Sequence, residues 1–146
     1  MKKAIYPGSF DPFHEGHLSI YNKAIKLFDE VIIYVTNNDE KTHQEILEKR
    51  KENILSEIPN CKIIADTKLT SLIAQENDSF YIVRGLRTFD EVEYELFLAS
   101  INKRLNQEVE TIIIFSDDEM KNISSSKIRE IKNKYKDDFQ ALTHKK

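Results

Sequence analysis

The order of apolar and polar residues along the chain predicts five strands that alternate with helices. Five short runs are rich in apolar residues, several of them β-branched, and each run is followed by a polar stretch. Continuous apolar runs are typical of strands that are covered on both faces of a sheet. The strands expected from these runs are 4–6, 31–35, 62–65, 80–83 and 111–115.

The segments between these strands carry apolar residues at helical spacing. After His17, apolar residues recur at positions 18, 21, 25 and 28, and a second stripe runs through 46–58. Further helices are expected around 69–75, over 90–105 and after 123, with a charged, partly ordered tail over 132–146. Regular alternation of strand and helix predicts one α/β domain over 1–146. It is a Rossmann-like doubly wound sheet of five parallel strands with helices on both faces.

Four polar motifs follow expected strands directly. They are 8–17 after the first strand, 37–41 after the second, 84–87 after the fourth and 116–126 after the fifth. In an open parallel sheet, ligands bind outside the carboxyl ends of the strands. We therefore expect all four motifs to converge on one crevice.

The first motif reads Gly-Ser-Phe-Asp-Pro-Phe-His-Glu-Gly-His and leads into a helix. A helix N-terminus attracts anions because its first N–H groups are unpaired and the helix dipole is positive there. His14 and His17, three residues apart, add donors on the same side. This pattern favours a phosphate site, and the alternative is a turn in which the two histidines only cap the helix.

Two later motifs also fit phosphate. Arg84 and Arg87 flank a glycine at the end of a strand, and the guanidinium group donates hydrogen bonds in pairs. Salt bridges with Glu91 or Glu95 are the alternative. Three serines, 124–126, open the last helix; one serine would suffice as an N-cap, and the surplus hydroxyls favour a second phosphate cradle.

Composition excludes several function classes. The chain of 146 residues has 22 basic and 25 acidic residues, which gives no general grip on nucleic acid. No stretch has the roughly 20 apolar residues of a membrane span, and the start lacks a signal peptide, so we expect a cytoplasmic protein. The acidic run 117–119 reads as a solvated turn, and His14 and His17 lack a third ligand. No protein-held metal is therefore predicted.

The motif 8–17 resembles the signature of the nucleotidyltransferase superfamily. Together with Arg-Gly-Leu-Arg at 84–87, Glu-Tyr-Glu at 93–95 and Ile-Ser-Ser-Ser at 123–126, it is similar to the bacterial phosphopantetheine adenylyltransferase family. The resemblance implies transfer of AMP from ATP to 4′-phosphopantetheine, which yields dephospho-CoA and pyrophosphate. It also implies Mg²⁺ carried by ATP and a homo-hexamer.

The resemblance assigns roles residue by residue. His17 is expected to be catalytic, and His14, which stands where the family commonly has Thr, is a possible phosphate contact. The ATP site is expected to comprise Ser9, Phe10, His17, Gly85, Leu86, Arg87, Glu95, Met120, Lys121, Asn122, Ile123, Ser124, Ser125 and Ser126. The acceptor site is expected to comprise Ser9, Lys41, Thr70 and Arg84.

Two alternatives to this function stay open at the level of sequence. One is a related transferase that uses the same histidine motif, for glycerol phosphate with CTP or for nicotinate mononucleotide with ATP. The other is a nucleotide-binding module without catalysis. An assay of pyrophosphate release separates them.

Overall fold

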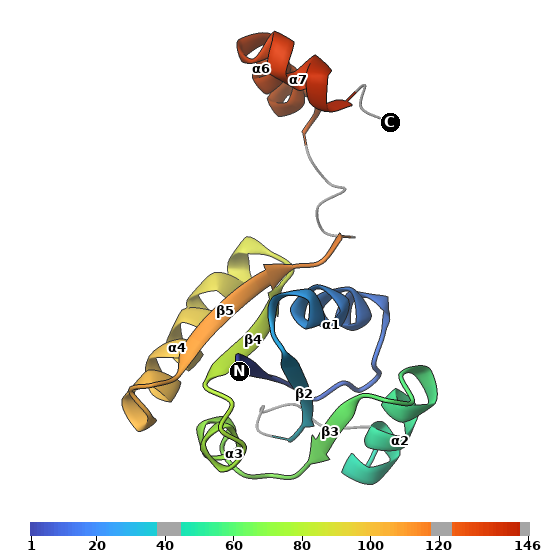
Figure 1. Cartoon of the computed structure of the whole chain (residues 1–146), viewed down its shortest axis with the longest axis vertical. Helices are drawn as coiled ribbons and strands as arrows, with labels where there is room; N and C mark the ends of the chain where they lie inside the picture. Colours follow the sequence, from blue (N-terminus) through green and yellow to red (C-terminus); the bar gives the residue numbers. More distant parts are fainter. Residues whose placement is uncertain (38–44, 118–123, 144–146) are drawn as a thin grey trace.

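The computed structural model describes residues 1–37, 45–117 and 124–143, and its centre is a five-stranded parallel sheet (Figure 1). The strand order is β3-β2-β1-β4-β5, so the chain starts in the middle and winds outward in both directions. The strands are β1 (Lys3–Gly8), β2 (Glu30–Val35), β3 (Lys62–Ala65), β4 (Tyr81–Leu86) and β5 (Glu110–Phe115). This confirms the predicted fold class.

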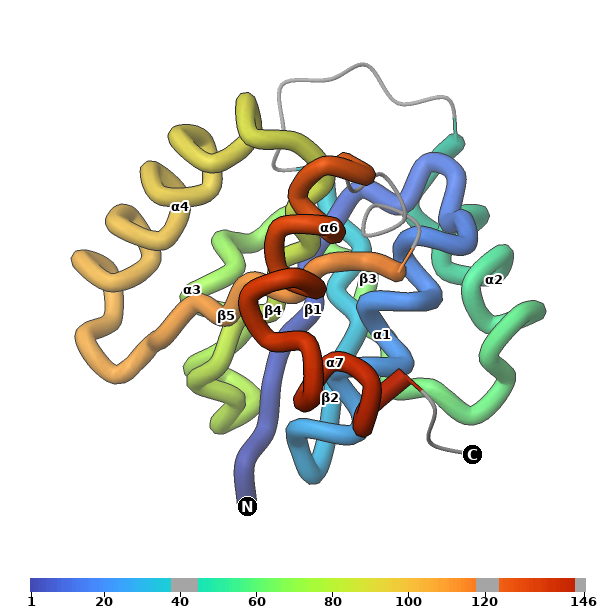
Figure 2. Tube along the Cα trace, turned by 90° about the horizontal axis from the view of Figure 1, so that it is seen from above, coloured from blue at the N-terminus to red at the C-terminus, as the bar shows by residue number. Residues whose placement is uncertain are grey.

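Helices cover both faces of the sheet. Those described are α1 (Glu15–Leu27), α2 (Leu47–Glu57), α3 (Thr70–Glu76), the single 3₁₀ turn η1 (Phe89–Glu91), α4 (Val92–Leu105), α6 (Ser125–Lys134) and α7 (Lys136–Thr143). Seen from above, α1 and α2 lie on one side of the strands, and α3 and α4 lie on the other (Figure 2). The helix predicted over 90–105 therefore begins as a 3₁₀ turn, and the predicted tail contains a further helix.

The apolar runs of the strands are explained by this double cover. Along β2, Val31, Ile33 and Val35 pack in the cluster that includes Ile20 and Ala24 of α1. Ile32 and Tyr34, between them, belong to the opposite cluster with residues of α3. Successive side chains point to opposite faces of a strand, so a strand buried on both sides has no polar alternation.

The carboxyl ends of β1 and β2 are tied together. β1 and β2 pair in register from Lys3 with Glu30 to Gly8 with Val35. Just beyond, the Thr36 N–H donates to the Gly8 carbonyl at 3.0 Å. The loops that follow these strands therefore start from one fixed edge.

The last two helices stand apart from the sheet (Figure 1). α6 and α7 contact each other, and neither contains a buried residue. Ile128, Ile131 and Tyr135 on α6 and its C-cap are exposed. The core around the sheet therefore packs without side chains from α6 or α7.

Candidate active site

A cavity of about 1020 Å³ opens at the carboxyl edge of the sheet. Its wall comes from the loop between β1 and α1, the end of β4, the start of α3 and one side of α4. The residues predicted from sequence that line it are Ser9, Phe10, His14, His17, Thr70, Arg84, Gly85, Leu86, Arg87 and Glu95. Motifs 8–17 and 84–87 therefore converge, as expected from the sheet topology.

His14 and His17 form a capping box at the start of α1. The His14 side chain accepts from the Gly16 N–H at 3.1 Å, and the His14 N–H donates to Nδ1 of His17 at 3.2 Å. The two rings stack with centroids 3.9 Å apart. The capping alternative is therefore real, but both rings also face the cavity. The capping hydrogen bonds fix the orientation of both rings at the cavity wall.

His17 is held as a neutral imidazole. Its ring packs against Phe10 and Phe13, with centroids 5.0 and 5.5 Å away. Burial, followed by the charges of His14 and Arg87, lowers the pKa of His17 to about 3. Since Nδ1 accepts the His14 N–H, the single proton of the neutral ring sits on Nε2. His17 is thus a neutral hydrogen-bond donor toward a ligand.

The neutrality of His17 predicts a pH dependence of stability. The unfolded chain protonates this imidazole near pH 6.5, whereas the folded protein resists protonation down to about pH 3. The free energy of unfolding should therefore decrease as the pH falls from 6.5 toward 3. His17→Asn should weaken this decrease in urea titrations. In NMR spectra, the His17 ring signal should not titrate between about pH 5 and pH 8; a midpoint near the ordinary value would contradict the assignment.

Arg84 and Glu95 form a buried ion pair at the floor of the cavity. The Arg84 Nε and Nη2 atoms lie 2.8 Å from the Glu95 carboxylate, and Nη1 donates to the Pro7 carbonyl at 3.2 Å. Glu95 is 5% exposed. Burial by itself would lower the pKa of Arg84, but the hydrogen bonds and charge of Glu95 outweigh it and raise that pKa. The salt-bridge alternative is therefore correct for this arginine, which still lines the cavity.

Arg87 lies beside the histidines. Its Nη2 contacts Nε2 of His14, and its backbone N–H donates to the Glu91 carboxylate at 2.8 Å. Gly16 makes room for this arrangement, because a Cβ there would lie 2.9 Å from the His14 ring and 3.6 Å from the Arg87 guanidinium. The cation thus sits at the N-terminus of α1, where an anion would already be favoured.

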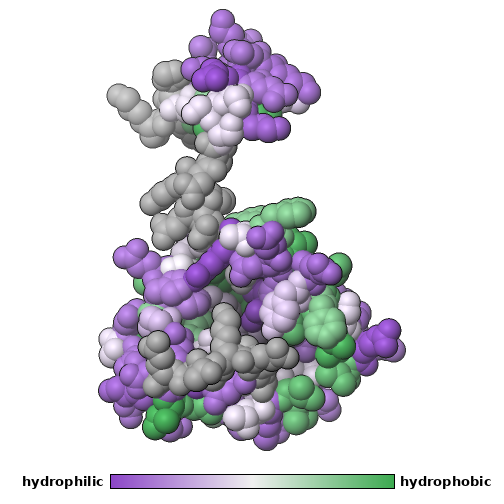
Figure 3. All heavy atoms as spheres, turned by 180° about the vertical axis from the view of Figure 1, so that it is seen from behind, coloured by the Kyte–Doolittle hydropathy of each residue, from purple (hydrophilic) through white to green (hydrophobic). Residues whose placement is uncertain are grey.

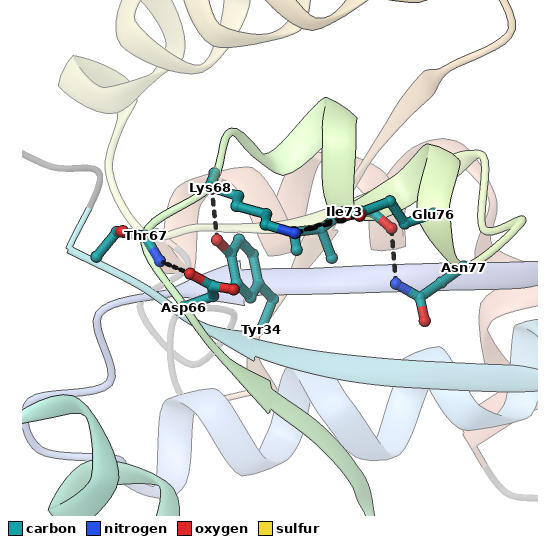
Figure 4. A network of polar contacts seen from close by, with 7 residues as sticks. All are labelled: Tyr34, Asp66, Thr67, Lys68, Ile73, Glu76 and Asn77. Carbon is teal, nitrogen blue, oxygen red and sulfur yellow. Dashed lines mark hydrogen bonds and ion pairs between the residues drawn. The ribbon is translucent and has the colours of Figure 1, made fainter.

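Thr70 lines the cavity at the start of α3. The segment just before it is fixed by polar contacts (Figure 4). The Tyr34 hydroxyl donates to the Lys68 carbonyl, and the Thr67 N–H donates to Asp66 at 2.7 Å. Lys68 pairs with Glu76 across α3 at 3.2 Å. The start of α3 is therefore held against β2.

The remaining predicted residues fall into two groups, those outside the described ranges and the serines at the start of α6. Lys41, Met120, Lys121, Asn122 and Ile123 lie outside the described residues. Ser124, Ser125 and Ser126 begin α6 without lining the cavity, and the Ser124 and Ser126 hydroxyls bond each other at 2.8 Å. The expected convergence of four motifs is thus not seen for the serines, because α6 does not pack on the sheet.

Some lining residues were not predicted. Tyr94, Leu98 and Asn102 of α4 line the cavity, as does Thr36 after β2. Positions 94, 98 and 102 follow the helical spacing that brings every fourth residue to one face, so this signal was present in the sequence. Within the described residues, no group of three His, Cys, Asp or Glu side chains could hold a metal ion, and no helix could cross a membrane.

Comparisons with known proteins find relatives that match nearly the whole chain. The family model described as cytidylyltransferase-like matches residues 5–131. The phosphopantetheine adenylyltransferase of Mycoplasma capricolum is 43% identical over 135 residues, which cover 90% of this chain and 96% of the relative. The protein of the same name from Bacteroides thetaiotaomicron is 39% identical over 145 residues, covering 97% of this chain and 95% of the relative.

Solved structures share the fold at lower sequence identity. A lipopolysaccharide core biosynthesis protein from Thermoplasma volcanium superposes with a TM-score of 0.55 and 21% identity, covering 80% of this chain and 97% of that one. A pantoate-β-alanine ligase from Francisella tularensis gives a TM-score of 0.52 and 18% identity, covering 91% of this chain and 69% of that one. These structures support the fold alone.

Proposed function

The chain belongs to the cytidylyltransferase-like family and, within it, to the phosphopantetheine adenylyltransferases, and from this membership we propose that it transfers AMP from Mg-ATP to 4′-phosphopantetheine. The products are dephospho-CoA and pyrophosphate. The observation that carries the proposal is the neutral His17, whose Nε2 proton is available beside Arg87 in a cavity at the carboxyl edge of the sheet.

In the proposed mechanism the acceptor needs no general base, because its phosphate is already an anion. A phosphate oxygen of the acceptor bonds to the α-phosphorus of ATP, and the bond from that phosphorus to the bridging oxygen of the β-phosphate breaks. The electron pair leaves with pyrophosphate. Catalysis then rests on alignment and on stabilising negative charge. His17 donates its Nε2 proton in a hydrogen bond to an α-phosphate oxygen and keeps that proton throughout.

Two groups of residues divide the cavity in this proposal. Ser9, Thr70 and Arg84 bind the acceptor, with Arg84 held in place by Glu95. The residues proposed to contact ATP all line the cavity, and they are Ser9, Phe10, His17, Gly85, Leu86, Arg87 and Glu95. Lys41 for the acceptor, and 120–126 for ATP, remain predictions. Mg²⁺ enters as part of the substrate, since phosphate oxygens and water are the ligands that it prefers.

We also propose that the protein works in the cytoplasm as a homo-hexamer, with neither nucleic acid nor membrane as a partner. Support for assembly comes from α4, where Leu96, Phe97 and Leu105 are exposed. Hydrophobic residues gather on the side of the molecule where α4 runs (Figure 3). Large apolar side chains that gather on one exposed face are typical of an interaction site. Sedimentation analysis should give six times the 17.1 kDa chain mass, and a monomer would contradict the proposal.

Pyrophosphate release tests the reaction. Purified protein is mixed with Mg-ATP, with and without 4′-phosphopantetheine, and a parallel reaction contains CTP and glycerol 3-phosphate. Release that requires both ATP and phosphopantetheine is expected. Release with only another nucleotide and acceptor would assign a related transferase. ATP binding with no release for any acceptor would contradict catalysis.

A further inference from the structure

Arg50 is a charged residue in the interior of the molecule. It lies on α2, one turn before the fully buried Ile54, and is itself only 1% exposed. Its neighbours in sequence are charged, but positions 47, 50, 54 and 58 follow one helical stripe, and the other three are apolar. Arg50 therefore occupies a core position of the helix.

The Arg50 guanidinium joins the segments that leave β1 and β2. Its Nη1 donates to the Ser9 carbonyl at 2.8 Å and to the Thr36 carbonyl at 3.4 Å. Its Nη2 donates to the side-chain oxygen of Asn37, and Nε donates to the Glu45 carbonyl at 2.9 Å. One planar group thus bridges the segments that follow two neighbouring strands.

The charge of Arg50 is not neutralised by a carboxylate among the residues that the structure describes. All four of its acceptors are carbonyl or amide oxygens. Hydrogen bonds to a charged guanidinium are stronger than neutral ones, and the field of a buried charge is weakly screened in a low-dielectric interior. A neutral donor would be enough to hold a loop by a hydrogen bond. Arg50 in addition places a permanent positive charge within hydrogen-bond distance of the Ser9 carbonyl.

Ser9 and Thr36 both line the cavity, while Arg50 does not. We infer that Arg50 is a positioning residue for the phosphate of the acceptor. Its hydrogen bonds hold the backbone at Ser9 close to the backbone at Thr36. Its charge also adds positive potential on the side of these residues that faces away from the cavity. This inference rests on the proposed function, in which Ser9 binds that phosphate.

The test compares two ligands that differ only in the phosphate. Dissociation constants for 4′-phosphopantetheine and for pantetheine are measured by calorimetry on wild type, Arg50→Met, Arg50→Lys and Ile54→Val. In Arg50→Met, the preference for the phosphorylated ligand should fall by about ten-fold or more, because the Ser9 segment loses its charge-assisted hydrogen bond and the positive charge near it. Pantetheine affinity should stay within about three-fold, because Arg50 does not line the cavity and its charge acts mainly on an anionic group.

The control variants separate positioning from stability. Arg50→Lys keeps the charge and loses the planar fork, so its preference should be intermediate. Ile54→Val, a buried change on the same helix, should lower the melting temperature without altering the preference. An unchanged preference in Arg50→Met, or an equal loss for both ligands, overturns the inference.

Two further outcomes are decided in advance. If Arg50→Met does not fold, Arg50→Lys carries the test, and a preference equal to that of wild type overturns the inference. If wild type itself does not prefer the phosphorylated ligand and releases no pyrophosphate, the proposed function fails, and the inference fails with it. If wild type releases pyrophosphate and prefers the phosphorylated ligand, and Arg50→Met shows the same preference, only the inference about Arg50 is contradicted.

Discussion

Replacing His17 with alanine is expected to lower kcat by about 10²–10³-fold, the usual effect of removing one donor from a developing charge. Nδ1 of His17 accepts the His14 N–H, so only the Nε2 proton can be donated to the α-phosphate. Alanine removes this donor. KM for either substrate should change much less, since the contact strengthens as negative charge builds on the α-phosphate. Steady-state kinetics with both substrates measure this split.

A second variant at this position tests the hydrogen bond itself. His17→Asn retains a neutral donor and an acceptor for the His14 N–H, so it should keep more activity than His17→Ala. Circular dichroism checks that both variants fold, because the lost ring contacts with Phe10 and Phe13 also lower stability. A near-normal kcat for a folded His17→Ala would refute the role of His17.

Breaking the ion pair between Arg84 and Glu95 is expected to have the largest effect on stability. Glu95→Leu should cost roughly 3 kcal/mol, at the low end for broken buried pairs because Arg84 is partly exposed. It leaves the Arg84 charge without its carboxylate and loosens the hydrogen bond to Pro7, at the end of β1. Urea unfolding measures the loss.

The double variant Arg84→Met with Glu95→Leu separates stability from function. Two apolar side chains of similar volume should recover most of the stability, because neither charge is then left buried alone. Acceptor binding should stay weak, since Arg84 is gone from the cavity wall. If the double variant binds acceptor like wild type, Arg84 acts only on the fold.

The sequence was informative where structure is local or repetitive. The β-branched run before Thr36 predicted a strand covered on both faces, and β2 has that environment. The motif 8–17 predicted the turn into α1, because its glycines and histidines meet their partners within a few residues. The positions of Arg84, Gly85 and Arg87 could also be predicted, because they lie at or just after the carboxyl end of a strand, here β4.

The rest depends on contacts between distant segments. Arg50 reads as one more charge in a polar helix, and only the meeting of β1, β2 and α2 shows its burial. Sequence left the partner of Arg84 open between two glutamates, and Glu95 was decided by the packing of α4 against the sheet. The position of Ser124–126 could not be predicted either, since a capping pattern fixes a helix start without fixing where the helix docks.

The separation of α6 and α7 from the sheet implies two very different rates of hydrogen exchange within one chain. Helices of ten and eight residues are marginal in water without packing. Their amides should exchange through local opening, whereas those of β1, in the centre of the sheet, wait for global unfolding. Any ligand or neighbouring subunit that docks these helices would raise the free energy of their opening. Their exchange would then slow by the factor that corresponds to the free energy of docking. Slower exchange of these amides on adding a ligand would therefore show that the ligand docks the helices that follow Ser124.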